Sequence, residues 1–566
     1  MCDQQYVSTL NVLKDPWIPV VFLDGKIKDV GIIECFRNAE KIKTISNSKP
    51  YEKIAILRFL TAFITDVYQL DRRIERQKLY DAGSFEIERI ENYVKECEEK
   101  NGASFVLGDS QRSFFCFNYN PQVDTEGVKL SAAYLHLELP HGNNPIHIVA
   151  QREEDFEGDT LPQFLRAALA FNLFPTGNML KGANSKTGDN CYIDGVGKDG
   201  KPKYTAAYGS MGINAGSSMA AAEPVFFWPE CDNLFHTLVM CMRSQGELQN
   251  NLKLNDPPAF WNADAEPNPK AGKRGDIVTS VSFVSGLAFQ ARRIVPVIEN
   301  GKVYECYISN GYTNSNENVW HDPFAVRLRN HKSGEIFQMP AKGDREMWRN
   351  IGNLTASREE SWHLMPDVLR PIKKSADATD YYENISSLAM IPMTQNAGYS
   401  AMFYDDTVQI PKEYLEDSYL GEYLTTRMEI VEEISKMWDK LKISALLDNK
   451  DKFSGHYRDD ALQEYWVKIH QFLFDGDDSF LNHVIRMYHE DSSSFEKTAD
   501  KALFEYLTKS VKEICEKEEK NTNSWNMLVK IIRQIHGKNG CLHIFYGTLK
   551  KYWKKEGKDK NDTGSI

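Results

Sequence analysis

The sequence predicts an α+β protein, in which a large mixed domain with irregular loops is followed by a four-helix bundle. The chain has 566 residues, of which 42% are hydrophobic and 11% aromatic, as is typical of ordered proteins long enough for several domains. Strand-like and helix-like segments are mixed in the first part, whereas only helical periodicity remains in the last part. We therefore expect a mixed α/β domain over residues 1–414, a helical bundle over 415–556 and a polar tail over 557–566.

The mixed domain begins with a stiff, extended segment. Pro16 and Pro19 fix their own φ angles and push the preceding residues toward extended geometry. Trp17 and Ile18 therefore cannot lie inside a helix, and we predict a strand whose tryptophan is anchored in the core. A buried helix is expected next over residues 50–70, where apolar side chains recur every three or four positions.

A long irregular stretch separates two groups of predicted strands. Strands are expected around a turn in residues 103–119 and again over residues 281–330. Between about 137 and 223 regularity drops, apart from a helix over Gln163–Leu173. Such a stretch inside a compact domain is typical of a functional or mobile segment.

The last part of the chain has the periodicity of packed helices. Apolar residues repeat at intervals of three and four over residues 424–445 and again over 462–472. Ser493 and Glu496 have the spacing of a capping box at the start of a third helix. A fourth helix is expected over residues 528–549, despite two glycines within it. These four helices make up the predicted bundle.

Bulk composition argues against several classes of protein. The formal net charge of −12 argues against a stand-alone nucleic-acid binder, but not against a subunit whose partners supply the basic surface. The ten cysteines form no C-x-x-C pair, which fits reduced thiols and argues against a zinc knuckle or a disulfide framework. With no signal peptide and no apolar run of membrane-spanning length, we expect a cytoplasmic protein that contacts no membrane and carries no metal or cofactor.

Several segments resemble those of one protein family in their sequences and in their order along the chain. They are Asn11–Val20 (NVLKDPWIPV), Ala167–Asn172 (AALAFN), Gly286–Ile294 (GLAFQARRI) and Trp320–Pro323 (WHDP), followed by the closing helices. Together they resemble, over nearly the whole chain, the CasA family, the large subunit of the type I-E CRISPR surveillance complex (Cascade). Phe289 stands where that family usually has tryptophan.

The resemblance implies a function in antiviral defense without catalysis. CasA-like subunits lie beside the 5′ end of the guide crRNA, together with the other Cascade subunits. They recognise the target-adjacent motif (PAM recognition) in double-stranded DNA, help to open the duplex for R-loop formation and recruit the separate CRISPR helicase–nuclease. The resemblance thus implies a DNA-binding subunit of a multi-subunit complex that is not itself an enzyme.

Two other functions stay open as alternatives. One is a metal-dependent nuclease, because His321-Asp322 resembles the HD pair of phosphohydrolases. Pro323 follows at once and indicates a turn, whereas that kind of site needs further ligands on helices. The other is an assembly scaffold that does not inspect DNA.

The first predicted DNA-contacting segment is a loop that includes Gly142, Asn143, Asn144 and His147. It lies where the family has a loop that contacts the target-adjacent duplex. Asparagine side chains can donate and accept hydrogen bonds at base edges, and glycine permits close approach of the backbone. The alternative is an ordinary polar turn, because the same residue types are those that turns need.

The second segment includes Thr176, Gly177, Asn178 and Lys181, and corresponds to the family's glycine-rich reader of the minor groove. Only one glycine of that reader is present here. Side-chain contacts are therefore expected in place of contacts from the backbone alone, with nearby lysines available to phosphates. The alternative is a solvated insertion.

The third segment, Met393–Tyr399, corresponds to the family's loop that carries a strand-splitting wedge, often a glutamine. Gln395, Asn396 and Tyr399 are the candidates in this chain. A side chain inserted into an opened base step would keep the bases from stacking again. The alternative is an exposed loop with no contact to DNA.

Other conspicuous residues are predicted to be structural. Arg292 and Arg293 are neighbours on a predicted strand and face opposite sides, so that one of them is expected to be an ion-pair partner rather than a phosphate contact. Trp17 and Trp320 are interpreted as core aromatics rather than stacking platforms for bases.

Overall fold

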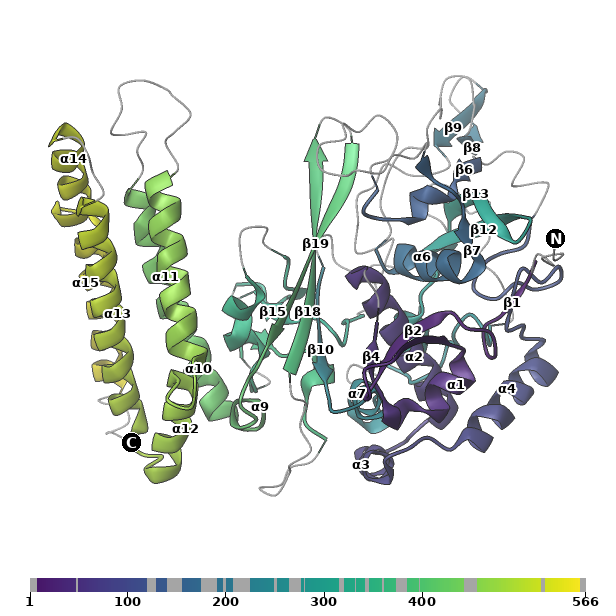
Figure 1. Cartoon of the computed structure of the whole chain (residues 1–566), viewed down its shortest axis with the longest axis horizontal. Helices are drawn as coiled ribbons and strands as arrows, with labels where there is room; N and C mark the ends of the chain where they lie inside the picture. Colours follow the sequence, from purple (N-terminus) through teal and green to yellow (C-terminus); the bar gives the residue numbers. More distant parts are fainter. Residues whose placement is uncertain are drawn as a thin grey trace. The chain divides into compact units, whose positions relative to one another are not determined.

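A computed structural model of the chain divides into two compact units, Met1–Val408 and Gln409–Ile566 (Figure 1). The first unit mixes helices with several small sheets, and the second consists of helices, which confirms the predicted α+β class. The residues that the structure describes are 8–46, 49–119, 129–139, 155–174, 191–196, 200–206, 224–248, 252–263, 276–278, 280–314, 320–330, 332–341, 346–358, 361–372, 384–395, 398–441, 456–520 and 525–559.

The described helices of the first unit are α1 (Ile32–Arg37), α2 (Pro50–Tyr68), α3 (Arg73–Ala82), α4 (Ile87–Asn101), α6 (Leu161–Leu173), α7 (Leu234–Cys241) and α8 (Phe283–Leu287). Among them, α2 and α4 are the longest. Single 3₁₀ segments occupy Ala39–Lys41, Ala132–Leu135, Gln245–Glu247, Met347–Leu354 and Asp367–Leu369.

The strands of the first unit form small sheets rather than one large one. They are β1 (Leu10–Asn11), β2 (Ile18–Phe22), β3 (Ile27–Val30), β4 (Ile42–Ile45), β5 (Val106–Leu107), β6 (Lys129–Ser131), β7 (Asp159–Thr160), β8 (Cys191–Val196), β9 (Pro202–Ala206), β10 (Val225–Glu230), β11 (Asp276–Val278), β12 (Arg292–Glu299), β13 (Lys302–Asn310), β14 (Tyr312–Asn314), β15 (Arg327–Arg329), β16 (Ile336–Gln338), β17 (His363–Leu364), β18 (Asn384–Gln395) and β19 (Gly398–Val408). Three sheets position the candidate site: β3-β2-β4, β12-β13-β6 with β7 paired to β13, and β10-β18-β19.

Helix α2 is the centre of the first unit. Every residue from Tyr51 to Tyr68 except Lys53 is buried, as is typical of a helix covered on all sides. It packs against α6, α7 and α8 and against strands of two sheets. Proline occupies its first turn, where a missing N–H costs nothing. The predicted helix over residues 50–70 is confirmed.

The predicted N-terminal strand is confirmed as β2, which pairs with β3 and β4. Trp17, directly before it, is fully buried, and its indole N–H donates to the carbonyl of Val12 at 2.9 Å. Its ring packs against Phe59 of α2, with 5.9 Å between the ring centroids. The stiff leader thus anchors the first sheet to the central helix.

Two strand predictions were wrong in part. In residues 103–119 only β5 forms a strand, and Phe117 instead donates one backbone hydrogen bond to Ile294. The apolar run from Val281 begins α8, because the hydroxyl of Ser282 accepts from the backbone N–H of Ser285 and caps a helix. A short apolar run alone does not distinguish a strand from a buried helical turn.

The second unit contains more helices than the four predicted. They are α9 (Glu413–Glu416), α10 (Ser418–Ser435), α11 (His456–Phe474), α12 (Phe480–Glu490), α13 (Phe495–Lys520), α14 (Trp525–His536) and α15 (Cys541–Asp559), with a 3₁₀ segment at Lys436–Lys440. Helix α13 packs against α11, α12 and α14, and α15 packs against α10 and α14 (Figure 1).

The predicted fourth helix is in fact two helices. The break lies between His536 and Cys541, where Asn539 has a φ of 71° and so adopts the left-handed conformation. Gly537 donates to the carbonyl of Arg533 at 2.9 Å and ends α14. The predicted capping box was also wrong, because the Ser493 hydroxyl donates to Asp491 instead of capping α13.

Glu518 on α13 makes the second unit sensitive to pH. Burial, together with the charge of Asp460, raises the pKa of Glu518 to about 7 from its usual 4.5. The folded state therefore keeps a proton that the unfolded state releases, so this group's contribution to stability is lost as the pH rises from about 4.5 to about 7.

We expect Glu518→Gln to raise the melting temperature of the whole chain at pH 8 by about 2 °C or more, and to change it little at pH 5. Scanning calorimetry of both proteins at the two pH values measures this difference. Glu516→Gln, which alters an exposed carboxylate on the same helix, is the matched control. An equal shift at both pH values would contradict the prediction.

Candidate nucleic-acid interface

Most residues of the three predicted DNA-contacting segments lie outside the described part of the chain. These are Gly142, Asn143, Asn144, His147, Thr176, Gly177, Asn178, Lys181 and Asn396. The backbone at Gln395 and Tyr399 is described. What the structure places are residues that flank these segments.

The third segment is the end of a long β-hairpin rather than a loop. Strands β18 and β19 pair without interruption up to Gln395, which lies opposite Gly398, and Tyr399 lies opposite Thr394. The expectation of a loop over all of Met393–Tyr399 was therefore wrong. The antiparallel pairing of the two long strands continues into the polar residues at their ends. A connection of two residues is enough to close a hairpin.

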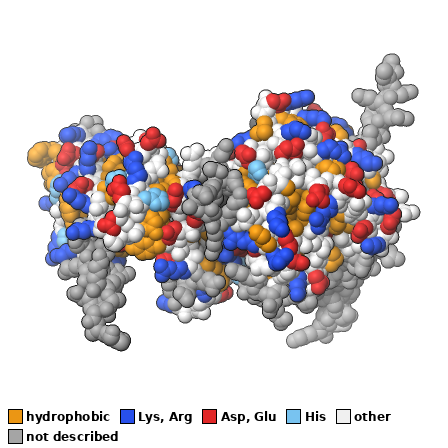
Figure 2. Space-filling model, turned by 90° about the horizontal axis from the view of Figure 1, so that it is seen from below, with side chains coloured by type: hydrophobic (Ala, Val, Ile, Leu, Met, Phe, Trp, Pro, Cys, Tyr) orange, Lys and Arg blue, Asp and Glu red, His pale blue; other side chains and the backbone are white. Residues whose placement is uncertain are grey.

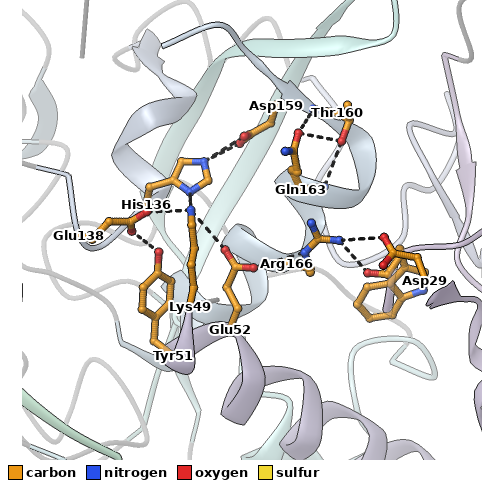
Figure 3. A network of polar contacts seen from close by, with 11 residues as sticks. Asp29, Lys49, Tyr51, Glu52, His136, Glu138, Asp159, Thr160, Gln163 and Arg166 are labelled. Atoms are coloured by element: carbon orange, nitrogen blue, oxygen red, sulfur yellow. Dashed lines mark hydrogen bonds and ion pairs between the residues drawn. The ribbon is translucent and has the colours of Figure 1, made fainter. Parts of the chain in front are cut away.

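A polar network with a buried centre holds both ends of the first segment (Figure 3). His136 precedes that segment and Asp159 follows it, and Nε2 of His136 lies 2.8 Å from the nearer carboxylate oxygen of Asp159. Each of these side chains is only 6% exposed. On the other side of the ring, the ammonium of Lys49 lies 2.7 Å from Nδ1 of His136.

The partners of His136 assign its proton. The ammonium of Lys49 can only donate, so Nδ1 accepts and the proton resides on Nε2, from which it is donated to Asp159. The imidazole ring thus links the ammonium of Lys49, which precedes α2, to the carboxylate of Asp159, which precedes α6.

Two glutamates complete the network around Lys49. The ammonium lies 2.8 Å from Glu138 and 3.6 Å from Glu52. Glu52 also faces Arg166 of α6 at 3.3 Å, and Arg166 donates to the carbonyl of Trp17 at 2.9 Å. Burial raises the pKa of Glu138, but its contacts with Lys49 and the Tyr51 hydroxyl more than offset this, and its pKa is lowered.

Aromatic packing joins the network to the ends of the other two segments. The Tyr51 hydroxyl donates to Glu138, while its ring packs on Phe403 of β19 with 4.7 Å between centroids. Phe403 also meets Phe174, the last described residue after α6, at 5.5 Å. Phe174 in turn contacts Phe226 of β10. The residues that precede the first two segments therefore meet the lower part of the β18–β19 hairpin, whose far end carries the third segment.

Comparison with known proteins bears on what this region does. The sequence model of the family described as CRISPR-associated protein Cse1 matches residues 11–506. The chain belongs to the Cse1 family. A curated CasA/Cse1 protein of Thermus thermophilus is 24% identical over 235 residues, an alignment that covers 41% of this chain and 39% of that relative.

Solved structures of Cse1 proteins share the fold. Thermus thermophilus CasA (Cse1) superposes with a TM-score of 0.64 at 16% identity, covering 95% of this chain and 99% of that one. Thermobifida fusca Cse1 gives 0.65 at 16% identity, covering 96% and 97%. A chain of a structure named "CRISPR RNA-guided surveillance complex" gives 0.60 at 14% identity, covering 89% and 99%.

In this Cse1-family chain Asp322 of the HD-like pair is part of the core, and His321 is half-buried. Oδ1 of Asp322 lies 2.7 Å from a guanidinium nitrogen of Arg58, and the side chains are 0% and 1% exposed respectively. Burial lowers the pKa of His321, as does the nearby charge of Arg327. Within the described ranges, no group of three or more His, Cys, Asp or Glu residues is arranged to hold a metal ion.

The remaining conspicuous residues of the Cse1 chain are structural. Arg292 and Arg293 are both buried, and their guanidinium groups donate to the backbone carbonyls of Ala291 and Asn118. Trp320 is 9% exposed and packs with Val281 in the core, as predicted. Neither arginine offers a surface to phosphate, because both guanidinium groups are directed into the protein.

The sequence-based interpretation missed Lys49, Tyr51, Glu138 and Asp159. The one local signal is that His136 and Glu138 directly precede the Gly/Asn-rich loop, while Asp159 directly precedes a helix with a Thr160–Gln163 capping box. Which of them meet in space depends on tertiary packing.

Among the helices of the described ranges, none is long and apolar enough to cross a lipid bilayer.

Proposed function

We propose that this chain is the non-catalytic large subunit of an RNA-guided type I-E CRISPR interference complex. In that complex it recognises the target-adjacent motif in double-stranded DNA, helps to open the duplex and recruits the helicase–nuclease. The observation that carries the proposal is the match of the Cse1 family over residues 11–506. The presence of a similar chain in an RNA-guided surveillance complex supports it.

The contacts between residues that flank the segments support a common task. Reading a motif and splitting the adjacent base step require that reader and wedge act on neighbouring base pairs. The ends of the two reading segments and the base of the β18–β19 hairpin meet through Tyr51, Phe174 and Phe403. The role of reader is assigned to Asn143 and Asn144.

Surface chemistry supports dependence on partners. Figure 2 shows Lys and Arg side chains interspersed with Asp and Glu, and the net charge of the chain is −12. The other Cascade subunits would therefore have to supply much of the basic surface that attracts target DNA. The guide crRNA, whose 5′ end the subunit would adjoin, would hold the target strand by base pairing. The helical unit exposes large apolar side chains of the kind that subunit contacts cover, namely Trp525, Ile532 and Tyr546, which are 77%, 40% and 45% exposed.

We expect Asn143→Ala with Asn144→Ala to weaken binding of duplex targets with the correct flanking motif by about tenfold or more, because each lost base contact is worth about 1–3 kcal/mol. Binding of a single-stranded target through the guide should stay unchanged. Gel-shift titrations of the reconstituted complex measure both affinities. Equal losses on the two substrates would contradict the assignment of these residues as readers.

A further inference from the structure

The two ends of the first reading segment are joined to each other by one buried contact. His136 and Asp159 are 23 positions apart in the sequence, and each is almost fully enclosed. Lys49 connects this pair to the start of α2, the most deeply buried helix of the unit. Loops commonly form without a buried polar pair that joins their two ends.

We propose that Lys49, His136 and Asp159 are positioning residues that set how strictly the flanking motif is discriminated. The inference rests on the proposed function, because the segment between His136 and Asp159 carries the assigned readers Asn143 and Asn144. The three residues act through the segment that they hold and do not themselves touch DNA. We call this set the clamp.

Each end of the clamp is fixed by a rigid element. Asp159 lies in β7, which pairs with β13 through Val303, and α6 starts immediately after it with a capping box. His136 follows the 3₁₀ segment Ala132–Leu135, and its backbone N–H donates to Ala133 at 3.0 Å. Lys49 directly precedes Pro50, the first residue of α2. The clamp thus ties both ends of the segment to the sheet and to the two main helices.

The energetics of burial make the clamp hard to open. A buried carboxylate or imidazole that loses its partner keeps the full cost of its desolvation, so the closed arrangement is strongly preferred. A chain segment with both ends held has fewer conformations than one with a free end. A reader held in this way could fit an incorrect motif only by opening the clamp, so that an incorrect motif loses more affinity than a correct one.

His136→Phe is the test variant. Phenylalanine keeps an aromatic ring beside Phe156, whose ring lies 5.8 Å from the imidazole, but it makes neither of the two hydrogen bonds. Asp159→Asn is the conservative counterpart, because an amide oxygen still accepts from Nε2. Glu247→Gln is the matched control, since this carboxylate binds the buried Arg76 elsewhere in the same unit.

The measurement uses the assembled complex and a target duplex randomised beside the target sequence. Sequencing of bound and unbound DNA gives the preference for the best flanking sequence over the average. We expect His136→Phe to reduce this preference by about fivefold or more, with unchanged affinity for a single-stranded target. Asp159→Asn and Glu247→Gln should keep the preference of the unmodified complex.

A second measurement separates positioning from general stability. Hydrogen exchange in the isolated full chain should become faster at both 129–139 and 155–160 in His136→Phe, and in neither with Glu247→Gln. If His136→Phe does not assemble, Lys49→Met provides the same tests, because it removes the contact to α2 and leaves the histidine–aspartate pair in place.

The outcomes distinguish the clamp from the function on which it rests. An unmodified complex with no flanking preference would overturn both. If the unmodified complex discriminates and His136→Phe discriminates equally well, the clamp is overturned and the proposed function stands. A reduced preference together with faster exchange at both ends establishes the clamp.

Discussion

Asp322→Asn is expected to lower the free energy of unfolding of the chain by about 3–5 kcal/mol. The substitution removes the charge that balances Arg58, whose guanidinium is 1% exposed and lies between the rings of Phe226 and Phe324 at 5.1 and 5.0 Å. Urea unfolding followed by circular dichroism measures the loss.

A double variant shows whether the loss comes from the unpaired charge. Arg58→Met with Asp322→Leu replaces both partners by apolar side chains, and an apolar replacement of a buried pair is often neutral. We expect it to recover most of the stability that Asp322→Asn loses. If the single variant unfolds at the same urea concentration as the unmodified chain, the pair contributes little to stability and the prediction is wrong.

Trp17→Ala is expected to lower the free energy of unfolding by about 3–5 kcal/mol, the range for deleting a large buried aromatic side chain. The indole is fully enclosed, contacts Phe59 of α2 and donates a hydrogen bond to Val12. The first sheet would lose its attachment to the central helix. The same unfolding assay applies.

Trp17→Phe serves as the companion to this prediction. It keeps most of the ring packing and removes the donor that binds the carbonyl of Val12. We expect a cost of about 1–2 kcal/mol, mainly from the unpaired carbonyl and the smaller ring. A loss as large as that of alanine would show that the hydrogen bond, rather than the packing, dominates.

The parts of the fold that follow local rules could be predicted from the sequence. Proline geometry placed Trp17 before a strand, and helical periodicity located α2, α10 and α11. The same rules fail where local signals are ambiguous. Around Val281 a serine cap converts an apolar run into a helix, and at Asn539 a left-handed residue divides the last predicted helix.

The candidate site was predictable only as segments. The residues that join the segments are separated by long stretches of sequence: Lys49 and His136 are 87 positions apart, and Tyr51 and Glu138 also 87. Polar residues of this kind have no periodicity, and at each position a solvated surface is an equally good local explanation. Only the packing of α2 against α6 determines which of them meet.

The β18–β19 hairpin has a stiff base and a compliant arm. Among the described strands, β10 pairs with β18 only as far as Ala389, whereas Ile391–Gln395 pair with β19 alone. At about 3.3 Å per residue this leaves an overhang of roughly 17 Å. Two-stranded ribbons twist and bend more readily than wider sheets. The strand ends Ile391–Gln395 and their partners in β19 can therefore bend about the edge of the three-stranded sheet while the hydrophobic interior below them stays unchanged.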